Sequence, residues 1–188
     1  MREALHMVLV LTAVCVVAAL GLARVHEMTR EPIREAMRQE RLRAIVAVLP
    51  EFDNAPDRDA RRIDGRTYYP AFREGRFVGA AFPVVSNEGY GGRIEALVGV
   101  DPQGRVTGVV ILAHAETPGL GAKFTDPAYL AQFRGKGLDN ARWAVRKDGG
   151  DFDQITGATI TPRALVKAIR QGLEAFRTAR SALTGDAR

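Results

Sequence analysis

The sequence has little of the chemistry on which metal and disulfide sites depend. Its 188 residues include one cysteine and three histidines, which excludes an intramolecular disulfide and a cysteine-based metal site. The histidines, His6, His26 and His114, lack the spacing of metal ligands, and we predict no protein-bound metal. Cys15 lies inside an apolar run, where a small buried thiol is the default interpretation.

The charge balance is basic but carries no pattern of a nucleic-acid reader. The formal net charge is +5, and no recognition motif accompanies it. Arginines and lysines alternate with acidic residues, as on solvated helix faces. We therefore predict no nucleic-acid partner, while a weak attraction to anionic lipid or to an acidic protein remains open.

One long apolar run stands near the start of the chain. After a tip at residues 1–3, residues 4–23 contain no Asp, Glu, Lys or Arg, and about 20 such residues span the hydrocarbon core of a membrane. A cleaved signal peptide is the alternative, since Gly21-Leu22-Ala23 resembles a cleavage site, but the run exceeds the usual apolar region of about 7–15 residues. We favour an uncleaved transmembrane helix.

Charges alone leave the orientation of this helix open. Arg24, Arg30 and Arg34 follow the run and only Arg2 precedes it, which by the positive-inside rule places the domain in the cytoplasm. Long domains, however, cross the membrane largely regardless of charge.

The remaining chain predicts a connecting helix and one domain. Residues 24–50 carry an apolar stripe of helical period, formed by Ile33, Ala36, Met37, Leu42, Ile45, Val46 and Leu49. This pattern predicts an amphipathic helix, ended by Pro50. The domain then occupies 51–188, and its polar start, 51–64, is predicted to be a surface loop.

The middle of the domain predicts two β-hairpins and later helices. The expected strands cover 66–72, 76–82, 94–100 and 105–112. Asp101-Pro102-Gln103-Gly104 suits a type I turn, whereas the glycine-rich run 87–92 reads as a close-approach or flexible loop. A short strand over 142–146, with Trp143 in the core, and a helix over 162–183 follow. We predict an α+β fold, an antiparallel sheet with flanking helices.

The stretch 153–162, Asp-Gln-Ile-Thr-Gly-Ala-Thr-Ile-Thr-Pro, combines a small-residue turn with a helix start. Gly157 and Ala158 leave little bulk around the hydroxyl of Thr159. Thr161 followed by Pro162 suits an N-cap and the first helical position. A hydroxyl just before a helix N-terminus is a favourable place for a phosphate, although an ordinary capped turn has the same composition.

This stretch resembles the Asp-x-x-(Ser/Thr)-Gly-Ala-Thr flavinylation motif, in which an extracytoplasmic flavin transferase joins FMN through its phosphate to the last threonine. Asp153, Thr156, Gly157 and Ala158 match, and Thr159 corresponds to the acceptor.

A second run, from His114 to Gly121, follows a predicted strand directly. It reads His-Ala-Glu-Thr-Pro-Gly-Leu-Gly, and such a loop on a rigid scaffold often carries a site. The run resembles the His-x-Glu-Thr-Pro-Gly-Leu-Gly signature of FMN-binding domains in membrane electron-transport complexes. It matches at every specified position, including Glu116, Thr117, Gly119 and Leu120.

With both motifs behind one apolar run, the chain is similar to the G subunits of Rnf (Rsx) electron-transport complexes. The resemblance extends to 89–94, which resembles the family's Gly-Tyr-x-Gly-x-Ile. It implies one covalent FMN, an extracytoplasmic (periplasmic) domain on a single-pass anchor in the cytoplasmic membrane, and electron relay in a ferredoxin:NAD⁺ oxidoreductase. Implied partners are the other Rnf subunits, notably D and the A/E pair, and the flavin transferase.

Roles follow from this resemblance. The flavin ring is expected near the loop of Thr117, Gly119, Leu120 and Gly121, with both glycines allowing close backbone approach. Glu116 and Lys123 either tune the charge near the ring or, as is commoner for such residues, are solvated. Alternatives are the FMN-binding C subunit of a Na⁺-translocating NADH:quinone reductase, an anchored assembly or sensory domain without redox function, and a freestanding FMN reductase.

Overall fold

The computed structural model describes residues 2–117 and 121–184. The chain divides into two compact units, Met1–Arg41 and Leu42–Arg188. Helix α1, Arg2–Val48, forms the first unit and contributes its last residues to the second. Within the described part of the chain, α1 is the one helix that is long and apolar enough to cross a membrane. Its most apolar stretch is not buried against other parts of the protein.

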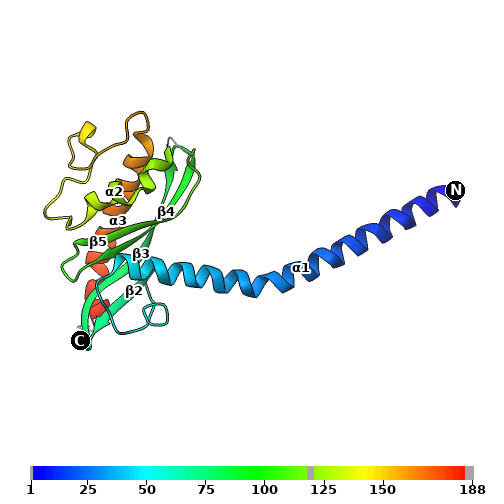
Figure 1. Ribbon diagram of the computed structural model, residues 1–188, viewed down its shortest axis with the longest axis horizontal. Helices are drawn as coiled ribbons and strands as arrows, with labels where there is room; N and C mark the ends of the chain where they lie inside the picture. The colour runs from blue at the N-terminus through cyan, green and yellow to red at the C-terminus, as the bar shows by residue number, and fades with distance from the viewer. Residues whose placement is uncertain (1, 118–120, 185–188) are drawn as a thin grey trace. The chain divides into compact units, whose positions relative to one another are not determined.

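The second unit is built on a five-stranded antiparallel sheet in the order β1-β2-β3-β4-β5 (Figure 1). The strands are β1 (Arg61–Ile63), β2 (Arg66–Arg73), β3 (Arg76–Gly89), β4 (Gly92–Val100) and β5 (Val106–His114). Every neighbour in the sheet is also the neighbour in sequence, so short turns connect all five strands. The α+β prediction is confirmed.

Short helical turns and one long helix complete this unit. They are η1 (Gly121–Thr125), α2 (Pro127–Leu130), η2 (Ala131–Phe133), η3 (Arg146–Asp148) and α3 (Ile160–Thr184). Figure 1 shows α3 running along the sheet. Its apolar face packs on the face of the sheet that presents Phe82, Val84, Ala96 and Val98. Alternation along each strand makes this possible, because successive side chains point to opposite faces.

The end of α1 covers the other face of the sheet. Ala44, Ile45, Val48 and Leu49 are buried there against apolar strand residues, namely Tyr69, Ala71, Ala81 and Leu97. Thr107 Oγ1 donates to the carbonyl of Val48. A Cβ on Gly99 would lie 2.1 Å from the same carbonyl oxygen, so glycine is required for this contact.

The predicted apolar stripe of the connecting helix was partly wrong. Ile45 and Leu49 are buried as expected, but Val46 is 62% exposed and Ile33 and Met37 are also exposed. The buried positions instead include Ala44 and Val48, which lie on the same side of α1 as Ile45 and pack against the sheet with it. Helical periodicity alone could not identify which stripe the sheet would cover.

The predicted hairpin turns were correct at Glu74-Gly75 and at Asp101–Gly104, where Asp101 Oδ1 accepts the N–H groups of Gln103 and Arg105 at 2.9 Å. The region 51–64 was predicted as loop throughout, but Arg61–Ile63 forms β1. This strand carries two arginines on a sheet edge, which suits an edge strand but gives no apolar alternation to recognise.

Two further expectations were wrong. The segment 142–146 is no strand: it makes one isolated parallel bridge, Val145 to Phe152, before η3 begins. The glycine-rich run 87–92 was predicted to be a loop but is mostly strand, since Gly89 pairs with Gly92 and only Tyr90-Gly91 forms the turn between β3 and β4. Strand pairing there is sustained by backbone contacts that side-chain patterning does not encode.

Candidate functional site

Three segments that are distant in the sequence meet at one end of the sheet. They are the β3–β4 turn, the chain leaving β5, and the start of α3. The N–H of Gly91 donates to Glu116 Oε1 at 3.0 Å, and the N–H of Tyr90 donates to Thr161 Oγ1 at 3.3 Å. These segments carry the glycine-rich run and both sequence motifs, so the structure brings all three together.

The β3–β4 turn lies directly against the backbone after β5. A Cβ on Gly91 would lie 2.1 Å from the carbonyl oxygen of Ala115, and a Cβ on Gly89 would lie 2.9 Å from Glu116 Oε1. The prediction of a close approach is therefore confirmed. The N–H groups of Tyr90 and Gly91 bind protein acceptors, so this turn offers neither of them as part of a phosphate cradle.

Glu116 is buried, which contradicts the expectation of a solvated side chain. It is 5% exposed, because the side-chain-free glycines of the β3–β4 turn leave room for its carboxylate. Its own N–H donates to His114 Nδ1 at 3.2 Å, and the His114 ring meets Phe124 edge-on at 5.4 Å. Within the described residues, Glu116 Oε2 is buried without a hydrogen-bond partner.

Thr159 directly precedes α3. Its carbonyl accepts the N–H of Arg163 at 3.2 Å, and its side chain is only half-buried. The turn before it closes through the N–H of Ala158 on the carbonyl of Ile155 at 3.0 Å. Gly157 has a φ of 79°, and nothing lies within 4 Å of a Cβ built there. The expected position of Thr159, just before a helix N-terminus, is confirmed.

The expected N-cap was wrong by two residues. Thr161 lies inside α3 and is fully buried, with its hydroxyl accepting the N–H of Tyr90. Helix ends are commonly displaced by one or two residues from a sequence-based boundary. Here the displacement matters, because it puts Thr159 rather than Thr161 at the free N–H groups of the helix.

The segment before Thr159 is fixed by side chains that sequence reasoning did not single out. Tyr129 donates its hydroxyl to the carbonyl of Asp153 at 2.9 Å, and the N–H of Asp153 donates to Gln132 Oε1 at 2.6 Å. Burial raises the pKa of Tyr129 to about 12, so this donor keeps its proton. The Asp153 carboxylate pairs with Arg146 at 2.7 Å.

Aromatic packing also supports the segment before Thr159. Phe152 is fully buried and stacks on Phe133, with ring centroids 4.9 Å apart. Trp143 lies 4.7 Å from Phe152 and is half-buried at the edge of the core, in agreement with the prediction that it packs in the core. Its Nε1 donates to the carbonyl of Gly137 at 2.8 Å.

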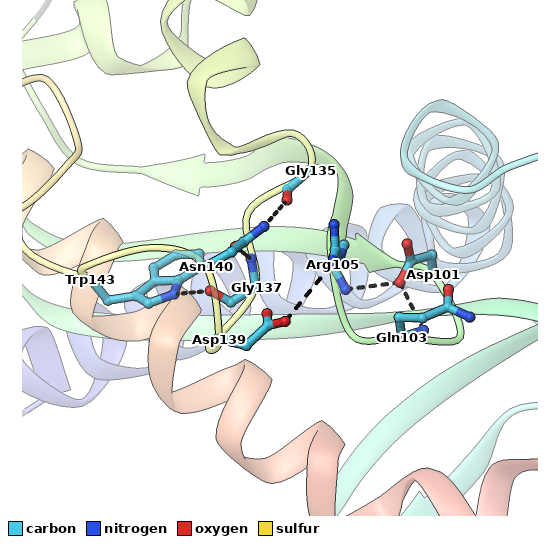
Figure 2. A network of polar contacts seen from close by, with 8 residues as sticks. All are labelled: Asp101, Gln103, Arg105, Gly135, Gly137, Asp139, Asn140 and Trp143. Atoms are coloured by element: carbon cyan, nitrogen blue, oxygen red, sulfur yellow. Dashed lines mark hydrogen bonds and ion pairs between the residues drawn. The ribbon is translucent and has the colours of Figure 1, made fainter.

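Polar contacts hold this aromatic region to the β4–β5 turn. Figure 2 shows the network, whose members are Asp101, Gln103, Arg105, Gly135, Gly137, Asp139, Asn140 and Trp143. Asn140 bridges its own loop by accepting the N–H of Gly137 at 2.7 Å and donating to the carbonyl of Gly135 at 2.9 Å. The N–H of Gly135 donates to the carbonyl of Val106 at 2.8 Å, and Arg105 pairs with Asp139 at 3.8 Å, so this loop is held to the start of β5.

Acid is expected to loosen the segment before α3. Hydrogen bonds from the Arg163 side chain lower the pKa of Asp148 below its ordinary 3.8, and those from the backbone and side chain of Arg142 lower the pKa of Asp151. A lowered folded-state pKa contributes stability above pH 3.8 that is lost as the pH falls through the folded-state value.

Hydrogen exchange, corrected for the intrinsic rate at each pH, measures this effect. Protection over 142–163 is expected to fall between pH 6 and about pH 3, while the β3–β4 hairpin, which contains neither Asp148 nor Asp151, serves as the internal reference and is expected to change less. Equal protection of 142–163 at both pH values would contradict the role of these ion pairs.

Some predicted residues lie at the edge of what is described. Thr117 is exposed, and its carbonyl accepts the N–H of Ala122 at 3.2 Å. Gly119 and Leu120 lie outside the described residues, so their roles stay predictions, and Gly121 begins η1. Among the described residues, no group of three or more His, Cys, Asp or Glu side chains is arranged to hold a metal ion.

A cavity of about 550 Å³ lies along β5, next to these segments. His114, Thr125 and Arg134 line it together with apolar residues of the strand, among them Val110 and Leu112. Its volume is that of a small-molecule pocket. His114 belongs both to this cavity and, through its bond from the N–H of Glu116, to the meeting point of the three segments.

Comparison with known proteins gives a consistent result. The family model of the FMN-binding domain matches residues 89–174, which include all three segments. The chain is 40% identical to the G subunit of the ion-translocating oxidoreductase complex of Stutzerimonas stutzeri, over 90% of this chain and 79% of that protein. It is also 40% identical to the G subunit of Shewanella baltica, over 82% of this chain and 80% of that protein.

The fold agrees with that assignment. The crystal structure of NqrC from Shewanella oneidensis matches with a TM-score of 0.54 and 25% identity, over 74% of this chain and 73% of that chain. Sequence and structure together therefore show that this chain belongs to the family of G subunits of ion-translocating oxidoreductase complexes and contains the FMN-binding domain.

Proposed function

We propose that this chain is a membrane-anchored flavoprotein subunit that carries one FMN, joined through its phosphate to Thr159, and relays electrons within an Rnf-type ferredoxin:NAD⁺ oxidoreductase complex. The observation that carries the proposal is the position of the Thr159 hydroxyl. It lies half-buried in a turn of small residues at the start of α3. Membership of the G-subunit family and the match to the FMN-binding domain support the flavin and the complex.

The chemistry of attachment suits this position. A phosphodiester keeps a negative charge, and the start of a 25-residue helix favours an anion, through the macrodipole and the N–H groups of Ile160 and Thr161, which have no intrahelical acceptor. Thr156 and Gly157 are exposed and Ala158 is small, so a transferase can bring its bulky flavin substrate to the hydroxyl. The unpaired oxygen of Glu116 is a polar atom that a cofactor of this kind would satisfy.

A phosphate link tethers the flavin without altering its ring, whose electronic properties are then tuned by the protein. FMN supplies one- and two-electron redox chemistry. We place the ring near Thr117, Gly119, Leu120 and Gly121, with Leu120 on a ring face and Thr117 at a ring edge. The chain itself contributes binding, orientation and a local electrostatic environment rather than turnover of a substrate.

The apolar helix and the family support a single-pass membrane anchor. We propose that residues 4–23 span the cytoplasmic membrane, that 24–50 connect, and that 51–188 lie on the extracytoplasmic, periplasmic side. A covalent link would keep FMN in a compartment where free FMN is not resupplied. The D subunit and the A/E pair are the proposed partners, with a flavin transferase required for maturation.

A second candidate is the flavin-bearing C subunit of a Na⁺-translocating NADH:quinone reductase. The structural likeness to NqrC favours it. The identity of 25% to NqrC, against 40% to G subunits over most of the chain, ranks it second. An anchored assembly or sensory domain without flavin remains a third candidate.

Mass spectrometry tests the proposal. Full-length chain coexpressed with a flavin transferase is expected to gain the mass of one FMN less water, to retain it after denaturation, and to carry it on the peptide that contains Thr159. The flavin is held by a covalent bond, so unfolding cannot release it. An unmodified mass, with the transferase shown to be active on another protein, would contradict the proposed function.

A further inference from the structure

Two adjoining cavities, each of about 310 Å³, lie along the C-terminal half of α3. Both are lined by Leu138 and Arg177, so they form one depression, which we call the α3 groove. The helix forms one wall, and the β4–β5 turn and the loop that contains Leu138 form the other. Arg177 lies 17 residues after Ile160, about 25 Å along the helix axis. Among the described residues that line the groove, none belongs to the runs 114–121 or 153–162, so the groove is separate from the site proposed for FMN.

Hydrogen bonds and packing fix both walls of the groove. On the loop, which Figure 2 shows, Asn140 accepts the N–H of Gly137 at 2.7 Å, and Trp143 Nε1 donates to the carbonyl of Gly137 at 2.8 Å. On the helix, Leu173 and Phe176 line the groove and are each 1% exposed, so this wall is closely packed. The groove is therefore formed before any partner binds, and binding does not carry the entropic cost of ordering the loop.

The acidic side chains that line the groove already have partners. Among the described residues these are Asp139 on the loop and Glu174 on the helix. Glu174 pairs with Arg170 at 3.0 Å, and Asp139 pairs with Arg105 at 3.8 Å. Neither carboxylate is therefore left to neutralise a further cation of the groove.

Arg177 and Arg180 are cations of the groove without a counter-charge. Both are exposed, and within residues 2–117 and 121–184 neither makes an ion pair or a hydrogen bond. They are three residues apart on α3, so their side chains leave neighbouring positions of the helix surface. Two like charges at this spacing repel each other, and an anion bound between them would remove that repulsion.

We propose that the α3 groove binds an acidic segment of a partner subunit. A guanidinium binds a carboxylate through two parallel N–H donors, so Arg177 and Arg180 each take one carboxylate of the segment. An apolar side chain of the same segment covers Leu138, which is half-buried and lines both cavities. The family to which the chain belongs consists of subunits of a larger complex, which supplies such partners. The inference depends on that membership and not on a flavin at Thr159.

The shape of the groove favours a protein segment over a membrane surface. Each cavity is at the lower end of ligand-pocket volumes, and it lies between two fixed walls, so single side chains fit into it. A layer of lipid headgroups is flat on this scale and does not follow such a groove. The apolar lining, which includes Leu138 and Trp143, also suits a side chain better than a phosphate.

Binding to the rest of the complex tests the inference. The remaining subunits, purified together and immobilised in uncharged detergent without lipid, are titrated with full-length chain made without a flavin transferase. Arg177→Gln combined with Arg180→Gln removes both charges and keeps good helix formers. Because two charge-assisted contacts are lost, affinity is expected to fall at least about 10-fold at low salt. The difference should narrow as the salt concentration rises.

Arg62→Gln combined with Arg76→Gln is the matched control. These two arginines are exposed on the sheet, and the double substitution changes the net charge by the same amount. It is expected to change affinity less than about twofold. Equal losses in the two double variants would show attraction by net charge alone and would overturn the inference.

Arg177→Lys combined with Arg180→Lys distinguishes a bound carboxylate from diffuse attraction. Lysine keeps the charge but cannot form the bidentate contact, so the affinity is expected to lie between those of the unsubstituted chain and the glutamine variant. Full affinity of the lysine variant would overturn the inference. A loss in the glutamine variant that appears only in nanodiscs containing phosphatidylglycerol would identify lipid as the occupant and would overturn it as well.

Cross-linking in the intact complex identifies the occupant. A photo-crosslinking amino acid at Gln103, an exposed residue that lines the groove, is expected to join a peptide of another subunit that carries Asp or Glu side chains close together. The same amino acid at Glu74, in the β2–β3 turn, is expected not to join that peptide. Attachment from Gln103 to a peptide without acidic residues, or to no other subunit, would overturn the inference. Absence of covalent flavin with binding intact would contradict the proposed function alone.

Discussion

Replacement of Thr159 by alanine is expected to abolish covalent attachment of FMN completely, since alanine has no hydroxyl to form the ester. The fold should survive. The carbonyl of Thr159, which accepts the first bond of α3 from Arg163, is unchanged, and loss of a threonine at a helix start costs about 1 kcal/mol. Intact mass after coexpression with the transferase measures the effect, with circular dichroism to verify folding.

Thr159→Ser is the matched control for this experiment, because it keeps the hydroxyl and removes only a methyl group. It is expected to retain flavin. Thr156→Ala removes the other hydroxyl of the turn, which is exposed, and any flavin on that variant should still map to the peptide position of Thr159. Covalent FMN on the Thr159→Ala protein would show that the acceptor lies elsewhere and would contradict our assignment.

Replacement of Phe152 by alanine is expected to be the most destabilising substitution near the site. Phe152 is fully buried between Phe133 and Trp143, and truncating such an aromatic costs about 3–5 kcal/mol through lost transfer energy and the cavity left behind. For a domain of this size that lowers the melting temperature by roughly 10 °C. Thermal unfolding of the full-length protein in detergent, followed by near-ultraviolet circular dichroism, measures the change.

The position of Phe152 gives this substitution a functional consequence. It directly precedes Asp153, whose backbone is held by Tyr129 and Gln132, so a cavity beneath it should also raise hydrogen exchange up to Thr159. Tyr90→Ala is the control: that ring is 74% exposed, and its removal should cost less than about 0.5 kcal/mol. Equal melting temperatures for the two variants would show that the aromatic cluster does not support this segment.

Local sequence signals were sufficient wherever neighbouring residues decide the structure. The Asp101–Gly104 turn and the helix predicted over 162–183 each depend on interactions within a few residues, and each was predicted correctly. Errors arose where a distant partner decides. β1 forms because β2 is available to pair with it, and Val145 makes only an isolated bridge because Phe152 returns beside it.

Glu116 illustrates the limit most clearly. A charged residue in a loop signature is solvated by default, and nothing within its own segment indicates burial. Its carboxylate enters the interior because Gly91, 25 residues earlier, supplies an N–H donor and no side chain. The sequence contained one relevant signal, the glycine-rich run at 89–94, but that run does not indicate which residue packs beneath it.

The amino-acid sequence by itself determined the apolar helix, the antiparallel α+β domain, the family and the position of Thr159 before a helix, because all of these follow from short-range patterns and contiguous motifs. Only the tertiary structure decided that the three motif segments meet, that α1 ends against the sheet, and that Glu116 is buried with one oxygen free. Such contacts join residues far apart in the chain, and their formation depends on how the whole sheet and α3 pack.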